Sequence, residues 1–385
     1  MNFAPHPLAL RKALEPRLPE MLAVLRRFTV VESPSTDKSA AERCARIIAA
    51  TWRRLDVSLS LIPQKRCGPH ILIDVRGATA RPADQLLVLG HYDTVYPSGT
   101  LRHMPFHVTS RKAFGPGVFD MKAGIVQAFF ALEALQRSGV LLRKRIVFLW
   151  TSDEEIGSES SRKLIESHAR RSDAVFVLEP AFGPKGLLKT ARKGVGELEL
   201  TVHGRASHAG LAPEKGVNAV HELALQIARL RTWNNPRSGV TLNADVIEGG
   251  SRVNVIADRA RARFDLRALR VTDIRLLEAR LRALRPILPG AKLEISGAFN
   301  RPPLERKMSR ALFRRAKSLA AQMNLELDEC TVGGGSDGNL TAARGIPTLD
   351  GLGAVGDGAH SIHEHILTHT MPARAALLAS LLCVC

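Results

Sequence analysis

The chain has 385 residues, of which 45% are hydrophobic and 24% are charged, and its formal net charge is +18 at pH 7. This composition excludes a disordered chain, and the length predicts two domains. No apolar run approaches the roughly 20 residues of a membrane span, and the N-terminal residues contain no apolar core of signal-peptide length. We therefore expect a cytoplasmic protein that does not bind membranes, and its five scattered cysteines fit reduced thiols.

The basic excess is spread in short pairs such as Arg26-Arg27 and Arg314-Arg315, with no long block and few interleaved aromatic residues. We interpret these pairs as solvated helix faces and expect no nucleic-acid partner. A non-catalytic basic binding protein is the less favoured alternative.

The first half of the chain alternates predicted strands with predicted helices. Apolar residues at helical spacing indicate helices over 37–53, 121–137 and 159–171. Short apolar runs indicate strands over 57–62, 71–75, 86–89, 146–150 and 174–178. Continuous apolar runs are typical of strands that are buried on both faces of a parallel sheet. We therefore predict an α/β domain with a mainly parallel sheet sandwiched by helices.

The pattern changes near Lys193, where residues 197–202 alternate apolar and polar side chains. The predicted elements that follow are a helix (218–232), two strands (240–247 and 252–267), a helix (272–285) and a strand (291–297). This β-α-β-β-α-β order is that of a ferredoxin-like unit. The earlier rhythm then resumes with helices over 308–323 and from 371 onward. We predict one domain of residues 1–192 and 300–385, into which an α+β domain of residues 193–299 is inserted.

Acidic and histidine side chains follow three of the predicted buried strands. They are His91 and Asp93, the pair Glu154 and Glu155, and Glu179. The carboxyl ends of parallel strands meet at one edge of a sheet, where ligands bind. Imidazole and carboxylate groups are the ligands of zinc-type catalytic centres, so the joint placement predicts a metal site. Taken singly, each residue could be structural; the pair after 146–150, for example, could cap the next helix.

Two further candidates lie outside these strand ends. Asp120 precedes the helix 121–137 and could be its N-cap, although the tight, glycine-rich loop 115–119 also suits a carboxylate held close to an ion. His360 belongs to a segment with three histidines. The spacing of His363 and His365 does not fit a His-Glu-x-x-His zinc helix.

A glycine run at 333–335 precedes a short predicted helix, and its backbone N–H groups could bind an anion. The run lacks the Lys-Ser/Thr ending of a P-loop, so a substrate carboxylate fits better than a phosphate. The segment 351–356 matches Gly-x-Gly-x-x-Gly, but no apolar helix follows it, and we reject a dinucleotide site.

Together these segments closely resemble the M20 metallopeptidase family, which includes aminoacylases, acetylornithine and succinyl-diaminopimelate deacylases, and glutamate carboxypeptidases. The resemblance spans nearly the whole chain in the expected order. It is carried by residues 90–95, 117–124, 153–158, 179–180, 204–210, 333–338 and 359–361.

The resemblance implies a zinc exopeptidase-like catalytic domain with an inserted dimerisation or lid domain. It also implies two Zn²⁺ ions, for which Co²⁺ or Mn²⁺ can substitute. The implied ligands are Asp120 as the bridge, His91 and Glu179 at one ion, and Glu155 and His360 at the other. His360 is chosen because it alone fits the family's His-Ser-x-x-Glu arrangement. Glu154 would be the general base, and Asp93 would support His91.

The resemblance further assigns residues to the substrate. His208 would donate a hydrogen bond to the oxyanion, often in the active site of a partner subunit, so we expect a homodimer. Asn254 and Arg267 match positions that contact the substrate carboxylate, which Gly334 and Gly335 would also meet.

We therefore expect a dizinc hydrolase that cleaves an amide bond next to a free carboxylate, in a short peptide or an N-acyl amino acid. The glycine run together with residues 205–210 favours the glutamate-carboxypeptidase branch. An N-acyl-amino-acid deacylase acting on N-acetyl or N-succinyl substrates is the alternative, and no residue in the chain separates the two.

Overall fold

The computed structural model describes residues 5–77 and 84–385. The chain is an α/β protein that divides into two compact units. The second unit consists of Arg192–Glu305 and Val332–Gly335, and the remaining residues form the first. The predicted insertion, 193–299, lies inside the second unit. Within that unit, the backbone N–H of Lys193 donates to the carbonyl of Val332.

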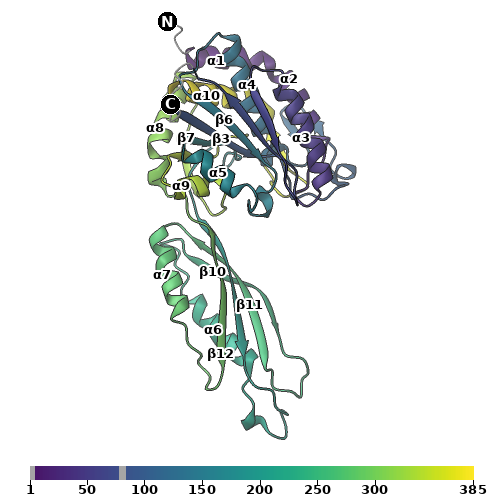
Figure 1. Ribbon diagram of the computed structural model, residues 1–385, viewed down its shortest axis with the longest axis vertical. Coiled ribbons are helices and arrows are strands. Elements are labelled where there is room, and N and C mark those ends of the chain that lie inside the picture. Colours follow the sequence, from purple (N-terminus) through teal and green to yellow (C-terminus); the bar gives the residue numbers. More distant parts are fainter. Residues whose placement is uncertain (1–4, 78–83) are drawn as a thin grey trace. The chain divides into compact units, whose positions relative to one another are not determined.

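The first unit is built on a six-stranded sheet (Figure 1). In spatial order its strands are β1 (Ser58–Ile62), β2 (His70–Val75), β6 (Arg145–Thr151), β3 (Gln85–His91), β7 (Ser172–Val177) and β14 (Thr348–Leu349). Strands β6, β3, β7 and β14 pair in parallel, whereas β1 and β2 pair antiparallel at one edge. The sheet is therefore mixed, and its parallel part holds the strands that the motifs follow.

Helices cover both faces of this sheet, which explains the continuous apolar runs of its central strands. On β6, Phe148 and Trp150 face one core, whereas Val147 and Leu149 face the other. The first core also contains α3 (Lys38–Trp52), α4 (Ala123–Arg137), α8 (Arg306–Gln322) and α10 (Met371–Val384). The second core contains α5 (Arg162–Ala169) and α9 (Asp337–Ala343).

An aromatic cluster fixes α3 against the sheet. The ring centroid of Trp52 lies 4.9 Å from that of Phe148 and 5.6 Å from that of Trp150. Phe129 of α4 meets Trp52 edge-on at 5.7 Å. Since these rings are buried and each aromatic side chain buries a large apolar area, they anchor the helical layer to the sheet.

The sequence reading missed or misplaced several elements. The helices α1 (Pro7–Leu14) and α2 (Leu18–Thr29) were not predicted, although α2 buries Met21, Val24, Leu25 and Phe28 at helical spacing. The helix α5 is shorter than the predicted 159–171. The strand β11 (Arg259–Ala268) is shorter than the predicted 252–267, because residues 252–258 form a loop. Smaller strands were also missed: β4 (His107–Val108), β5 (Lys112–Phe114), β8 (Leu188–Arg192), β13 (Glu329–Val332), β15 (Gly356–Asp357) and β16 (His365–Leu367).

The second unit has the ferredoxin-like arrangement. Its elements are β9 (Gly194–His203), α6 (Ala219–Arg231), β10 (Thr241–Gly249), β11, α7 (Val271–Arg282) and β12 (Lys292–Arg301). All strand pairs are antiparallel in the order β10-β11-β9-β12. The two helices pack their apolar side chains on one face of this sheet, where the core of the unit lies.

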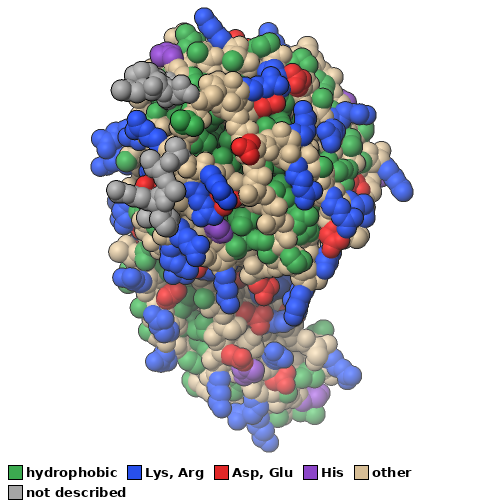
Figure 2. Space-filling view, turned by 45° about the horizontal axis from the view of Figure 1, so that its top comes forward, with side chains coloured by type: hydrophobic (Ala, Val, Ile, Leu, Met, Phe, Trp, Pro, Cys, Tyr) green, Lys and Arg blue, Asp and Glu red, His purple; other side chains and the backbone are tan. Residues whose placement is uncertain are grey.

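The basic side chains are spread over the face shown in Figure 2, with acidic and hydrophobic side chains among them. This distribution agrees with the short basic pairs in the sequence. Among the described residues, no helix combines the length and the apolar character that crossing a bilayer requires.

Candidate metal centre

Three parallel strands bring the acidic and histidine side chains to one edge of the first unit's sheet. His91 is the last residue of β3, Glu155 lies in the short helix η4 (Glu154–Ile156) after β6, and Glu179 follows β7. Because β3 pairs in parallel with both β6 and β7, these carboxyl ends adjoin one another. The sequence predicted this meeting of three strand ends at one edge of the sheet.

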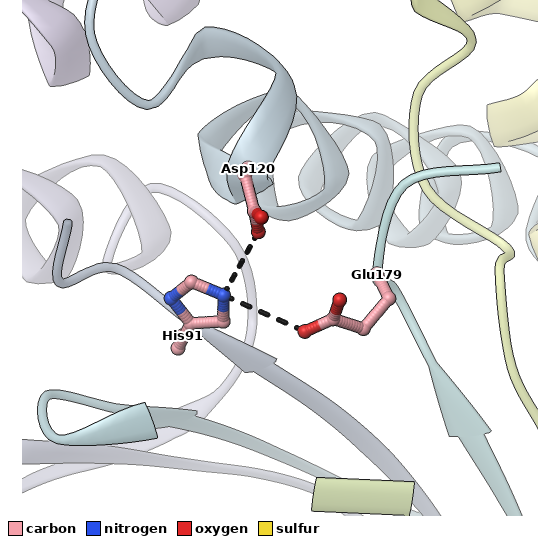
Figure 3. Close-up of side chains that lie close together, drawn as sticks. All are labelled: His91, Asp120 and Glu179. Atoms are coloured by element: carbon pink, nitrogen blue, oxygen red, sulfur yellow. Dashed lines mark hydrogen bonds and ion pairs between the residues drawn. The ribbon is translucent and has the colours of Figure 1, made fainter. Parts of the chain in front are cut away.

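One group of candidate ligands consists of His91, Asp120 and Glu179 (Figure 3). Its Nε2 atom lies 3.1 Å from Oδ1 of Asp120 and 3.5 Å from Oε1 of Glu179. His91 and Glu179 are buried, whereas Asp120 is partly exposed. One nitrogen and two carboxylate oxygens thus converge within a space that one metal ion could fill.

A second group surrounds His360, in the loop between β15 and β16. Its Nε2 atom lies 3.2 Å from Oε2 of Glu155 and 3.6 Å from Oδ2 of Asp120. Asp120 therefore turns one carboxylate oxygen toward each histidine. The two groups share this residue and together could hold two metal ions.

The electrostatics of the pair of groups suit a cation. Burial opposes protonation of His91, but Asp120, Asp93 and Glu179 raise its pKa well above the ordinary value. A hydrogen bond to Glu155 raises the pKa of His360 to about 9. The carboxylates of the two groups thus outnumber the imidazoles, and their negative charge favours protonation of both histidines. A metal ion bound here would replace those protons and neutralise the same excess of negative charge.

Asp93 connects the two strand ends behind this centre. Its fully buried carboxylate accepts hydrogen bonds from Ser35 Oγ at 2.7 Å and from the backbone N–H groups of Glu154 and Glu155 at 3.4 and 3.2 Å. Its Oδ1 atom also lies 3.4 Å from Nδ1 of His91. Asp93 therefore fixes the ring of His91 and the backbone of η4 together.

The sequence model of peptidase family M20/M25/M40 matches residues 87–383 of the chain. The chain belongs to peptidase family M20. It is therefore a hydrolase of a metal-dependent family, and its structure contains a potential dinuclear metal site.

Three relatives illustrate the breadth of the family. The chain is 29% identical to carboxypeptidase G2 of Pseudomonas sp. (strain RS-16) over 374 residues, which cover 94% of the chain and 89% of that protein. It is 30% identical to the succinyl-diaminopimelate desuccinylase of Paraburkholderia xenovorans over 321 residues, covering 77% and 82%. A dinuclear metal-binding M20 peptidase of Bacillus subtilis has the same fold, with a TM-score of 0.72, 15% identity and coverage of 97% and 98%.

One acidic residue of the glycine-rich motif has a role that the sequence did not reveal. Asp337, at the start of α9, is buried and accepts hydrogen bonds from Ser158 Oγ and, at 3.4 Å, from Thr151 Oγ1. These partners flank η4 on both sides. Asp337 therefore braces the segment that carries Glu154 and Glu155.

The same motif also forms the N-terminal cap of α9. Ser336 Oγ accepts from the N–H of Gly338, and Asn339 accepts from the N–H of Ser336, forming a capping box at α9. The carbonyls of Gly334 and Gly335 accept from the guanidinium of Arg192 at 3.2 and 3.1 Å. The side chains of Ser336 and Asn339 therefore cap the helix, and the role of Gly334 and Gly335 in binding a carboxylate stays a prediction.

Glu364 is a second acidic residue whose contacts the sequence did not reveal, and it binds the turn that carries Asp120. Glu364 is fully buried and accepts hydrogen bonds from the backbone of the turn that carries Asp120. Burial raises the pKa of Glu364 to about 7. The His-Ser-x-x-Glu spacing contains this residue, but nothing in the spacing says what the carboxylate touches.

In the second unit, the structure brings His208 and Asn254 together. The backbone N–H of Ala209 donates to the carbonyl of Asn254 at 2.9 Å. The exposed ring of His208 accepts at Nδ1 from the N–H groups of Gly210 and Leu211, each at 3.1 Å. In the neutral imidazole the proton therefore sits on Nε2, which makes that atom a donor.

Arg267 lies elsewhere in the same unit. In the register of β9 and β11, Arg259 pairs with His203 beside the His208 loop, whereas Arg267 pairs with Val195 at the opposite end. Eight residues separate these positions, or about 26 Å along an extended strand. The guanidinium of Arg267 contacts Asp265 at 2.7 Å and the carbonyl of Gly333 at 3.3 Å. The predicted substrate residues thus form two separate groups within one chain: His208 with Asn254, and Arg267 beside the glycine run.

Proposed function

We propose that this chain is a dizinc hydrolase that cleaves an amide bond adjacent to a free carboxylate, in the manner of a glutamate carboxypeptidase. The observation that carries the proposal is the division of the Asp120 carboxylate between two histidine-containing groups. A carboxylate in that position is a natural bridge between two ions. The B. subtilis M20 neighbour, which is named a dinuclear metal-binding peptidase, supports the same number of ions.

The donor set favours zinc. Each group supplies one imidazole nitrogen and carboxylate oxygens from two residues, and catalytic zinc sites combine three such ligands with an open position. A zinc pair in this position would polarise the amide carbonyl and lower the pKa of a water molecule at the open positions. Co²⁺ and Mn²⁺ accept similar ligands and are expected to substitute.

The chain's own residues would supply the proton transfers. We assign Glu154 as the general base that takes a proton from the attacking water and returns it to the leaving amine. Asp93 would keep His91 in the correct orientation. The proton on Nε2 of His208 would stabilise the developing oxyanion.

Relatives divide between two substrate classes. Carboxypeptidase G2 supports peptide-like substrates, because it aligns with 94% of the chain. The desuccinylase supports the alternative, an N-acyl-amino-acid deacylase, because its identity of 30% is similar. Both classes carry a free carboxylate, for which Arg267, Asn254 and the glycines Gly334 and Gly335 are the proposed contacts.

A substrate panel tests the proposal and separates its two forms. Purified protein loaded with zinc or cobalt would be assayed on N-acetyl, N-succinyl and N-formyl amino acids and on dipeptides with a C-terminal glutamate. We expect the highest kcat/KM on a substrate with a free carboxylate next to the cleaved bond, and loss of that activity with a chelator. Equal rates on the matching carboxamides would contradict the carboxylate requirement, and a preference for N-succinyl substrates would select the deacylase.

We also propose that the active enzyme is a homodimer. Residues at both ends of the second unit's sheet are assigned to the substrate, and about 26 Å separates those ends. A small substrate cannot contact both ends of one sheet. Two copies of the chain resolve this conflict if one contributes Arg267 and the other contributes His208 and Asn254.

Complementation between inactive chains tests the dimer. We expect His208→Ala to lower kcat by about 10²–10³-fold, because it removes an oxyanion donor. Mixing this variant with Asp120→Asn should restore about one quarter of wild-type activity, since random pairing makes half of the dimers mixed and each mixed dimer has one complete site. The assay is activity after joint refolding.

The exposed His221 on α6 supplies the control, and His221→Ala should retain full activity alone. A mixture of His208→Ala and Asp120→Asn that forms mixed dimers but stays inactive would exclude action across the interface.

A further inference from the structure

We propose that Glu364 is a positioning residue for the metal centre. It contacts the two segments that carry Asp120 and His360 and fixes their positions relative to each other. The inference rests on the proposed metal centre and adds a residue that contacts no metal. It concerns the second ligand group, formed by Asp120, Glu155 and His360.

The carboxylate of Glu364 fixes the turn that carries Asp120. Its Oε1 atom accepts from the backbone N–H groups of Phe119 and Asp120 at 2.8 and 2.9 Å, and its Oε2 atom accepts from that of Gly117 at 3.0 Å. Three donors within four residues of one irregular turn thus converge on a single buried side chain. Because a buried N–H group that loses its acceptor is costly, these bonds tie the backbone of Asp120 to Glu364.

The backbone of Glu364 is tied equally closely to His360. Glu364 N–H donates to the carbonyl of Ser361 at 3.1 Å, and Ser361 N–H donates to that of Gly358 at 3.0 Å. These bonds close a tight turn in which His360 has a φ of 62°, a left-handed value uncommon for a side-chain-bearing residue. The hydroxyl of Tyr96 also donates to the carbonyl of Ser361 at 2.9 Å. A displacement of Glu364 would therefore displace His360.

Two ligands that are 240 residues apart in sequence are thereby set by one side chain. Oδ2 of Asp120 and Nε2 of His360 lie 3.6 Å apart, which suits joint coordination of one ion. Glutamine at position 364 could not preserve this arrangement. Its amide has one acceptor oxygen, and its NH₂ group would face a backbone N–H that now donates to a carboxylate oxygen.

Glu222 provides a matched control for a purely structural role. It is also fully buried, and its carboxylate accepts from the backbone N–H groups of Ile287 and Leu288 at 3.0 and 2.7 Å. It belongs to the second unit, which contains none of the proposed metal ligands. Glu222→Gln and Glu364→Gln should both lower thermal stability, but only Glu364→Gln should alter metal binding.

The experiment is a competition titration of the folded, metal-free full chain with Zn²⁺, repeated with Co²⁺ to record the absorption of the bound ion. Wild type should bind two equivalents. In Glu364→Gln we expect one of the two binding events to weaken tenfold or more, as loss of an outer contact to a metal site typically causes. The cobalt spectrum of that event should change as well, whereas Glu222→Gln should match wild type in both readouts.

The outcomes separate the two proposals. Wild-type protein that binds no zinc would refute the proposed metal centre itself. Wild type with two ions and a Glu364→Gln variant that binds them as Glu222→Gln does would overturn the role of Glu364 alone. If Glu364→Gln does not fold, Tyr96→Phe tests the same turn more gently. It should weaken the same binding event by a smaller factor, and unchanged affinities in that variant would also overturn the role.

Discussion

Replacing Asp120 with asparagine is expected to lower kcat/KM by roughly 10³-fold or more. The two ions supply several kcal/mol of transition-state stabilisation, and each 1.36 kcal/mol corresponds to a factor of ten. Asparagine keeps the shape of the side chain but has a single acceptor oxygen and no charge. It therefore cannot offer one oxygen ligand to the His91 group and another to the His360 group. Steady-state kinetics on the best substrate of the panel measures the effect.

Asp173→Asn is the control for this change. Asp173 is an exposed aspartate on β7 that pairs with Lys144, and its loss should leave activity within about twofold of wild type, since surface ion pairs contribute little. An Asp120→Asn enzyme with near-wild-type kcat/KM would show that the two ligand groups do not form the catalytic centre.

The second large effect is expected at Glu154. Glu154→Gln removes the proposed general base and should lower kcat by about 10²–10⁴-fold while both metal ions stay bound. Retained metal is the decisive part of this expectation, because the neighbouring Glu155 is a proposed ligand and Glu154 is not. Kinetics and elemental analysis on the same preparation measure the two quantities together.

Glu159→Gln supplies the comparison, because Glu159 is an exposed glutamate in the segment that follows η4. It should behave as wild type in both measurements. Loss of one metal ion from Glu154→Gln would reassign that residue from base to ligand, and full activity would remove it from the mechanism.

The strand-edge part of the site was predictable because two general rules combine there. Buried parallel strands appear in sequence as continuous apolar runs, and their carboxyl ends meet at one edge. His91, Glu155 and Glu179 follow such runs directly. Asp120 lies in an irregular turn and His360 in a loop, where periodicity carries no information, and the family resemblance was needed to assign them to the two ions.

The supporting acids could not be foreseen for a different reason. Glu364 and Asp337 act through contacts with segments roughly 180 to 250 residues away in the chain. Their partners are backbone N–H groups and hydroxyls, which every segment possesses and which leave no recognisable pattern. Only the folded chain shows which of its many buried carboxylates face the ligand-bearing turns.

In the second unit, strand register separates the predicted substrate residues into two groups. The βαββαβ pattern predicted its fold, because alternation and helical spacing were both clear in the sequence. It did not predict that antiparallel pairing of β9 with β11 would place Arg267 far from His208. That separation is a property of strand register, and it supplies the physical argument for the proposed dimer.

Zinc counting by elemental analysis after equilibrium dialysis tests the central claim, a pair of ions bridged by Asp120, most directly. The expected result is two ions per wild-type chain, one in His91→Ala, one in His360→Ala and none in Asp120→Asn. A wild-type chain that binds two ions, together with an Asp120→Asn chain that still binds both, would contradict the shared bridge.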